Sequence, residues 1–160
     1  MPPASALKLT ELETWSQATA TSAIELASAI GLASFKPLQQ PSLGTNAPSG
    51  AYLPLVGPKV AVQVGFQTTA QGCRELAKAL LGMSEEDLAP DIVKDSICEI
   101  ANMLAGLVKR RMVHLDSGIR LGLPIFVEGR IHPGPGTNAS HSYFEAPGIP
   151  LAVVVFQPRE

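Results

Sequence analysis

The sequence predicts an α+β fold in which helices pack on one face of an antiparallel or mixed sheet. Two observations support this class. Apolar residues recur every three or four positions in segments long enough for helices, and short apolar runs bounded by turn residues lie between them. In addition, the two halves of the chain repeat the same order of a helix followed by strands. With 160 residues, we expect one domain over residues 1–160, with a short flexible N-terminus over about residues 1–8.

The first half is expected to form a helix, a loop and two strands. A stripe from Leu12 through Trp15 to Ile30 indicates a helix over residues 11–32, and Gly31 favours its end there. Residues 37–50 lack periodicity and are predicted to be a loop. Strands are expected over residues 51–56 and 59–67, with a turn at Gly57 and Pro58.

The second half begins after a further helix, predicted over residues 69–83. Residues 84–87 form a turn, and Pro90 opens a long helix over residues 91–112. Residues 119–130 and 143–156 are rich in strand formers, and residues 132–140 between them hold the Pro and Gly typical of a flexible loop.

An internal repeat relates the two halves. Residues 57–67 resemble residues 148–157, and residues 21–28 align with residues 95–102 position by position. Either the chain is a duplicated helix-plus-hairpin unit with a pseudo-twofold axis, or two amphipathic helices are similar by chance.

Composition excludes several classes of function. Hydrophobic residues make up 46% and charged residues 16%, and the formal net charge is −2. We therefore expect no nucleic-acid partner and no membrane association, although self-association is plausible.

Cys73 and Cys98 lack metal-site spacing and are expected to be reduced, as in a cytoplasmic protein. His132 and His141 are expected to share a flexible Pro- and Gly-rich loop and lack a third fixed ligand, so no metal site is predicted.

Polar residues on the long helix form the candidate site. Asp95, Glu99, Asn102, Gly106 and Lys109 follow the helical period opposite the apolar stripe. This line is either an ordinary solvated face or a surface for a partner, which the small Gly106 would let approach closely. The run Lys109-Arg110-Arg111 is expected to complement the helix dipole.

Residues 95–106 resemble the signature helix of the CheC/CheX/FliY phosphatases of bacterial chemotaxis. Asp95, Glu99 and Asn102 fit that family's pattern, and Pro124 follows one residue short of its spacing. The resemblance implies a phosphatase that hydrolyses the aspartyl phosphate of a CheY-type response regulator. Asn102 would orient the water and Glu99 would pair with a cation of the receiver, while Asp95, Gly106 and Lys109 would belong to the contact surface.

The same resemblance implies no cofactor in this chain, with Mg²⁺ held by the receiver. In the first helix Glu25 is kept but Ser28 replaces the Asn, so this copy is expected to be a degenerate second site, as in the single-site CheX type. A homodimer is implied, and strand 151–156 could pair across it or lie inside the monomer's own sheet. A non-catalytic CheX-like module that binds a receiver or flagellar-switch partner, or an unrelated α+β assembly domain, remains an alternative.

Overall fold

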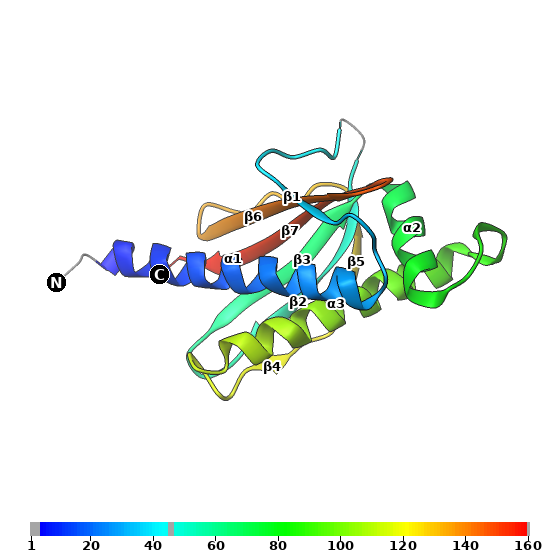
Figure 1. Ribbon diagram of the computed structural model, residues 1–160. Helices are drawn as coiled ribbons and strands as arrows, with labels where there is room; N and C mark the ends of the chain where they lie inside the picture. Colours follow the sequence, from blue (N-terminus) through cyan, green and yellow to red (C-terminus); the bar gives the residue numbers. More distant parts are fainter. Residues whose placement is uncertain (1–3, 45–46, 160) are drawn as a thin grey trace.

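The computed structural model describes residues 4–44 and 47–159, with a helical layer on one sheet (Figure 1). The helices are α1 (Ala4–Ala29), α2 (Ala70–Leu81), the 3₁₀ helix η1 (Glu85–Asp87) and α3 (Pro90–Met112). The strands are β1 (Lys36–Leu38), β2 (Ser49–Val56), β3 (Ala61–Thr68), β4 (Arg120–Leu121), β5 (Ile125–Glu128), β6 (Thr137–Ala146) and β7 (Ile149–Pro158). The predicted α+β class is confirmed.

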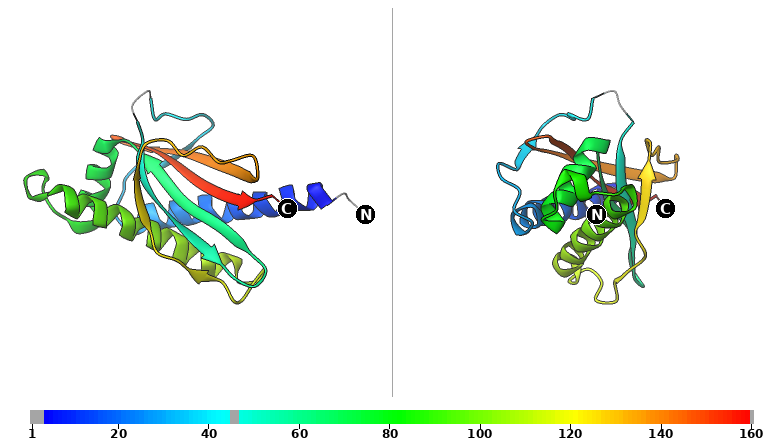
Figure 2. Two further views of the ribbon diagram at one scale, coloured as in Figure 1. Left: turned by 180° about the vertical axis from the view of Figure 1, so that it is seen from behind. Right: turned by 90° about the vertical axis from the view of Figure 1, so that its right-hand side faces the viewer.

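The strands form one antiparallel sheet in the order β1-β6-β7-β3-β2-β4, and β5 also pairs with β2. Figure 1 shows α1 and α3 crossing the near side of this sheet, and the reverse view in Figure 2 shows the strands in front of α1. One main core lies between helices and sheet. It includes Trp15, Phe66, Ile97 and Leu104, all at most 2% exposed.

The strand order carries the predicted pseudo-twofold repeat. The two central strands, β3 and β7, come from opposite halves of the chain, and β2 and β6 flank them. The sequence repeat aligns Phe66 with Phe156, and the register pairs Gln63 with Phe156 and Phe66 with Val153. The same alignment matches Gln63 with Val153, so the repeat converts the pair Gln63–Phe156 into the pair Val153–Phe66. A twofold axis between β3 and β7 requires this exchange. The hypothesis of chance similarity is therefore not needed.

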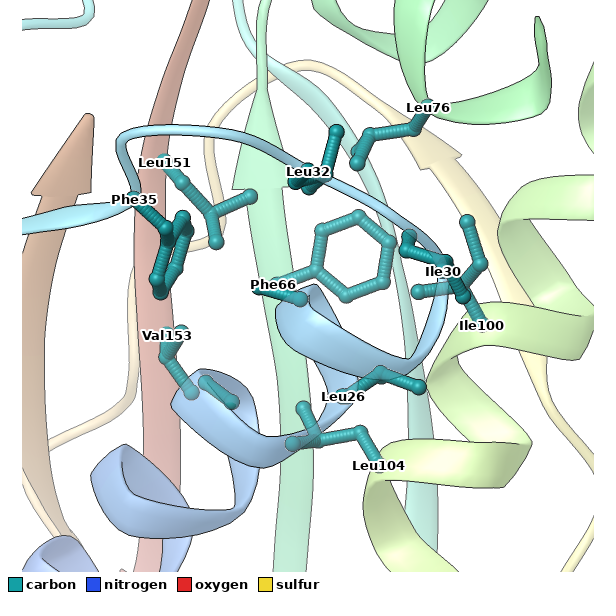
Figure 3. Close-up of a pocket in the computed structure, with 12 residues that line it drawn as sticks. Leu26, Ile30, Leu32, Phe35, Phe66, Leu76, Ile100, Leu104, Leu151 and Val153 are labelled. Atoms are coloured by element: carbon teal, nitrogen blue, oxygen red, sulfur yellow. The ribbon is translucent and has the colours of Figure 1, made fainter. Parts of the chain in front are cut away.

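The helices obey the same symmetry. The alignment of Glu25 with Glu99 also matches Leu26 with Ile100 and Ile30 with Leu104. Figure 3 shows Leu26 beside Leu104 and Ile30 beside Ile100, around an apolar cavity of about 30 Å³. The repeat maps each of these two contacts onto the other, so α1 and α3 are equivalent elements.

The structure corrects several predicted boundaries. Helix α1 begins at Ala4 and not at Glu11, so only residues 1–3 of the expected flexible N-terminus lie outside the described residues. Strand β1 lies in the predicted loop 37–50, because Lys36 to Leu38 pair with β6. Residues 137–140 belong to β6, where pairing with β7 outweighs their weak strand propensity. None of the described helices combines the length and hydropathy needed to span a membrane.

Strand β7 settles one open alternative. It pairs with β6 on one side and with β3 on the other. Because both of its edges are occupied, residues 151–156 lie inside the monomer's own sheet and are not a free edge for a second copy.

Candidate functional site

Helix α3 is held at its start by local interactions and along its length by burial. Pro90 occupies the first turn, where its missing N–H costs no hydrogen bond, and Asp91 complements the helix dipole. Before it, η1 is fixed to α2 by an ion pair between Lys78 Nζ and Glu85 Oε2 at 3.1 Å. The residues of the buried side are Val93, Ser96, Ile97, Ile100, Ala101, Leu104, Ala105, Val108 and Met112.

The end of α3 is anchored by a buried carboxylate. Asp116 accepts hydrogen bonds from the Lys59 backbone N–H at 2.7 Å and from the Gly118 N–H at 2.9 Å. These bonds lower the pKa of Asp116. The bond from Lys59 joins the segment after α3 to the β2–β3 turn, and so fixes the end of the helix against the sheet.

The five predicted site residues share the uncovered side of α3. Asp95 and Glu99 are exposed, and Asn102, Gly106 and Lys109 are partly exposed. The apolar Leu107 is only partly buried against the core. The helical period therefore predicts this face correctly, and a partner could reach all five residues at once.

Glu99 and Asn102 have no hydrogen-bond or ion-pair partner within the part of the chain that the structure describes. A spacing of three residues in a helix places their Cβ atoms about 5–6 Å apart. An exposed carboxylate and a carboxamide at this separation can contact one bound molecule together. The carboxamide can accept from a water and donate to an anionic oxygen, but it cannot act as a base.

Gly106 leaves a shallow surface next to this pair. A Cβ built at Gly106 would have no heavy atom within 4 Å. Packing within the protein therefore does not require glycine at this position. The absent side chain matters only to a molecule that approaches α3 from outside.

The flank of the site toward β5 combines a cation and an aromatic ring. Lys94 Nζ lies 5.9 Å from the centre of the Phe126 ring, and Phe126 packs against the main core. Cys98 lies on the same flank. Burial and the nearby Asp95 carboxylate raise the pKa of its thiol, which makes it a weak nucleophile.

The duplicated helix differs sharply at the equivalent positions. Glu25 Oε2 lies 2.8 Å from Arg111 Nη2, and Glu25 Oε1 lies 3.6 Å from Arg110 Nη2. Arg111 Nη1 also donates to Ser22 Oγ at 3.2 Å. Ser28 is exposed. The carboxylate that corresponds to Glu99 is therefore engaged within the protein.

Sequence reasoning missed this engagement. From the sequence, Arg110 and Arg111 are explained by the helix dipole alone. The order of charged residues along a sequence does not show which of them meet between two packed helices. The repeat makes α1 and α3 equivalent elements, but the contact between Glu25 and the basic end of α3 follows only from how the two helices pack.

The histidines do not form a metal site in the described residues, which contain no group of three His, Cys, Asp or Glu side chains suited to a metal ion. His141 lies in β6 and not in a flexible loop as expected. His132 follows β5, yet both side chains line one hollow on the sheet.

Comparison with known proteins gives one family match. The model of a family described as chemotaxis phosphatase CheX matches residues 51–143, which is more than half of the chain. The comparison with curated proteins gave no match.

Several solved structures share the fold. A CheC-like superfamily protein from Shewanella sp. PV-4 is 18% identical, with a TM-score of 0.71 over 89% of this chain and 96% of that one. The chemotaxis protein CheX from Vibrio vulnificus is 19% identical, with a TM-score of 0.70 over 89% and 95%. A CheX–CheY–BeF₃–Mg²⁺ complex from Borrelia burgdorferi contains a chain that is 18% identical, with a TM-score of 0.67 over 93% and 97%.

Proposed function

Because the chain belongs to the chemotaxis phosphatase CheX family, we propose that it hydrolyses the aspartyl phosphate of a phosphorylated CheY-type receiver. The observation that supports this proposal most directly is the pair Glu99 and Asn102 on the uncovered side of α3, which has no partner among the described residues. The Borrelia burgdorferi relative, whose structure is a complex with CheY, BeF₃ and Mg²⁺, supports a receiver as the substrate.

Asn102 is proposed to position the attacking water. Phosphoryl transfer has a loose transition state, so the catalyst mainly has to hold the water in line with the breaking bond. The Asn102 side-chain carbonyl oxygen would accept a hydrogen bond from this water, and the side-chain NH₂ group would donate a hydrogen bond to a phosphoryl oxygen. Asn102 touches the reacting water and is therefore the proposed catalytic residue.

Glu99 is proposed to dock the receiver. Its carboxylate would be repelled by the phosphoryl group, so it should bind a cation beside that group, most simply the receiver's active-site lysine. The fixed spacing between Glu99 and Asn102 then sets where the water sits. Asp95, Gly106 and Lys109 would complete the contact surface, and Mg²⁺ would be bound by the receiver.

The Glu25 face of α1 is proposed to be silent for two reasons. Ser28 lacks the carboxamide that would orient water, and Glu25 is already paired with Arg111. Each chain would therefore have a single working site on α3.

The test is the decay of phosphorylated receivers from the same organism, followed with and without the protein. We expect Asn102→Ala to lower the turnover rate about 100-fold, as loss of one positioned transition-state contact does. Glu99→Gln should raise KM about tenfold or more through the lost ion pair. Ser28→Ala and Glu13→Gln, which change exposed residues of α1, are the matched controls.

Two outcomes would contradict the proposal. If the wild-type protein accelerates decay of no receiver from its organism but still binds one, the protein is a non-catalytic receiver-binding module. If Asn102→Ala keeps full activity while a Ser28 variant loses it, the chemistry resides on α1 and not on α3.

A further inference from the structure

The sheet face opposite the helices carries a hollow of about 430 Å³. Its floor is formed by Tyr143, Ala152 and Gln67, which the strand registers place side by side on β6, β7 and β3. Side chains alternate along a strand, and Phe66 and Val153 point into the helix-covered core. The floor residues therefore point away from the helices, and the hollow is separate from the α3 face.

Two chain segments form its walls. One is the stretch Arg130 to His132 after β5, and the other consists of described residues between β1 and β2, namely Pro41, Leu43, Gly44 and Pro48. The Gly129 N–H donates to the Pro48 carbonyl at 2.7 Å and joins the two walls. Gly129 has a φ of 113°, which favours glycine at this turn. The walls are thus held together at their base.

The lining is cationic and contains no carboxylate. Within the described part of the chain, Arg120 and Arg130 have no hydrogen-bond or ion-pair partner, whereas Arg74, Arg110 and Arg111 each pair with a glutamate. Of these two unpaired arginines, Arg130 is the one that lines the hollow. His132 lies next to it in the wall. An unpaired guanidinium in a concave site of a protein with net charge −2 favours an anionic group such as phosphate or carboxylate.

Two near-parallel, stacked rings lie beside this cation in the lining of the hollow. The His141 and Tyr143 ring centres lie 6.1 Å apart, and their planes differ by 16°. Partial desolvation lowers the pKa of His141, which favours its neutral imidazole. A stacked pair of aromatic side chains can bind a further planar ring on its outer face. The Gln67 amide of the floor adds a donor and an acceptor.

We propose that this hollow binds a small organic anion that carries a planar ring, of about the size of a mononucleotide. Arg130 would bind the anionic group, His141 and Tyr143 would stack on the ring, and Gln67 would bind a polar ring edge. The volume lies in the range of about 300–1,000 Å³ that small-molecule sites occupy, and inorganic phosphate alone would leave most of it empty. This proposal does not depend on the phosphatase activity.

The test is titration of the full chain with AMP, GMP and inorganic phosphate, measured by calorimetry and by NMR shifts. At least one mononucleotide should bind with a Kd below about 1 mM and more tightly than inorganic phosphate. Arg130→Ala should weaken this binding about tenfold or more, and His141→Ala should weaken it severalfold. Arg120→Ala, which changes an exposed arginine of β4 outside the hollow, should leave the Kd unchanged.

Three results would overturn the proposal. The first is absence of binding by either mononucleotide below about 1 mM. The second is inorganic phosphate binding as tightly as the nucleotide, which would mean that the rings contribute nothing. The third is a nucleotide affinity that survives both Arg130→Ala and His141→Ala, in variants whose thermal unfolding matches the wild type.

Discussion

Gly106→Ala separates the stability of α3 from its use as a contact surface. A mid-helix Gly costs roughly 1 kcal/mol relative to Ala, and nothing within 4 Å opposes the new methyl group. The substitution should therefore raise the free energy of unfolding by about 1 kcal/mol, which is about 2–4 °C in Tm for a chain of this size. Denaturant and thermal unfolding measure this gain.

A larger side chain at position 106 should have an unfavourable effect on receiver binding, in contrast to the favourable effect of alanine on stability. If a receiver packs closely over Gly106, a larger side chain there blocks the approach. Gly106→Leu should therefore fold well but lower kcat/KM for the phosphorylated receiver about tenfold or more. Ala29→Leu, at an exposed position of α1, is the matched control and should change neither the free energy of unfolding nor kcat/KM much.

Gly72→Ala tests the packing argument itself. A Cβ at Gly72 would lie 2.0 Å from Thr68 Oγ1, so this variant should be destabilised despite its better helix propensity. The reasoning about α3 is refuted if Gly106→Ala destabilises the protein. The docking proposal is refuted if Gly106→Leu keeps the wild-type kcat/KM in a stably folded protein.

Two further predictions concern the anchors of α3. The pKa of Asp116 is lowered in the folded state, so its stabilising contribution is complete above the unfolded-state pKa and is lost as pH falls through the folded-state pKa. Asp116→Asn should thus reduce the loss of unfolding free energy between neutral and acidic pH, whereas Glu13→Gln, at an exposed position of α1, should not; equal acid profiles for wild type and Asp116→Asn would contradict this. The Glu25–Arg111 pair is partly exposed, with side chains 45% and 32% accessible, so a double-mutant cycle of Glu25→Gln and Arg111→Met should give a coupling energy below about 1 kcal/mol and unchanged phosphatase activity. A coupling above about 2 kcal/mol, or lost activity in Glu25→Gln, would show that this pair does more than occupy Glu25.

Much of the candidate site could be predicted from the sequence because it lies on one helix. The period of 3.6 residues fixes which side chains share a face, and α3 accordingly presents Glu99, Asn102 and Gly106 together. The roles proposed for them come from the family pattern and await the receiver assays. The pairing of Glu25 with Arg111 joins residues that are distant in the chain, and local periodicity has no information about such a contact.

The hollow beside Arg130 illustrates the same limit more strongly. His132 and His141 looked like neighbours in one flexible loop, but pairing with β7 places His141 in a strand. Residues of three strands and two connections then converge on one floor. No local pattern could predict this, because the register of β6, β7 and β3 decides which side chains meet.

The α+β class, the buried and exposed sides of α3, and the repeat that relates Phe66 to Phe156 can all be read from the amino-acid sequence. These features follow from residue periods and from similarity between segments, which are properties of the chain. Three features required the folded structure. Strand β7 lies at the centre of the sheet, and Glu25 is paired while Glu99 has no partner among the described residues. A cationic hollow forms on the sheet face opposite the helices. Those features depend on long-range strand pairing and helix packing, whose free energy comes from contacts between segments that are far apart in the sequence.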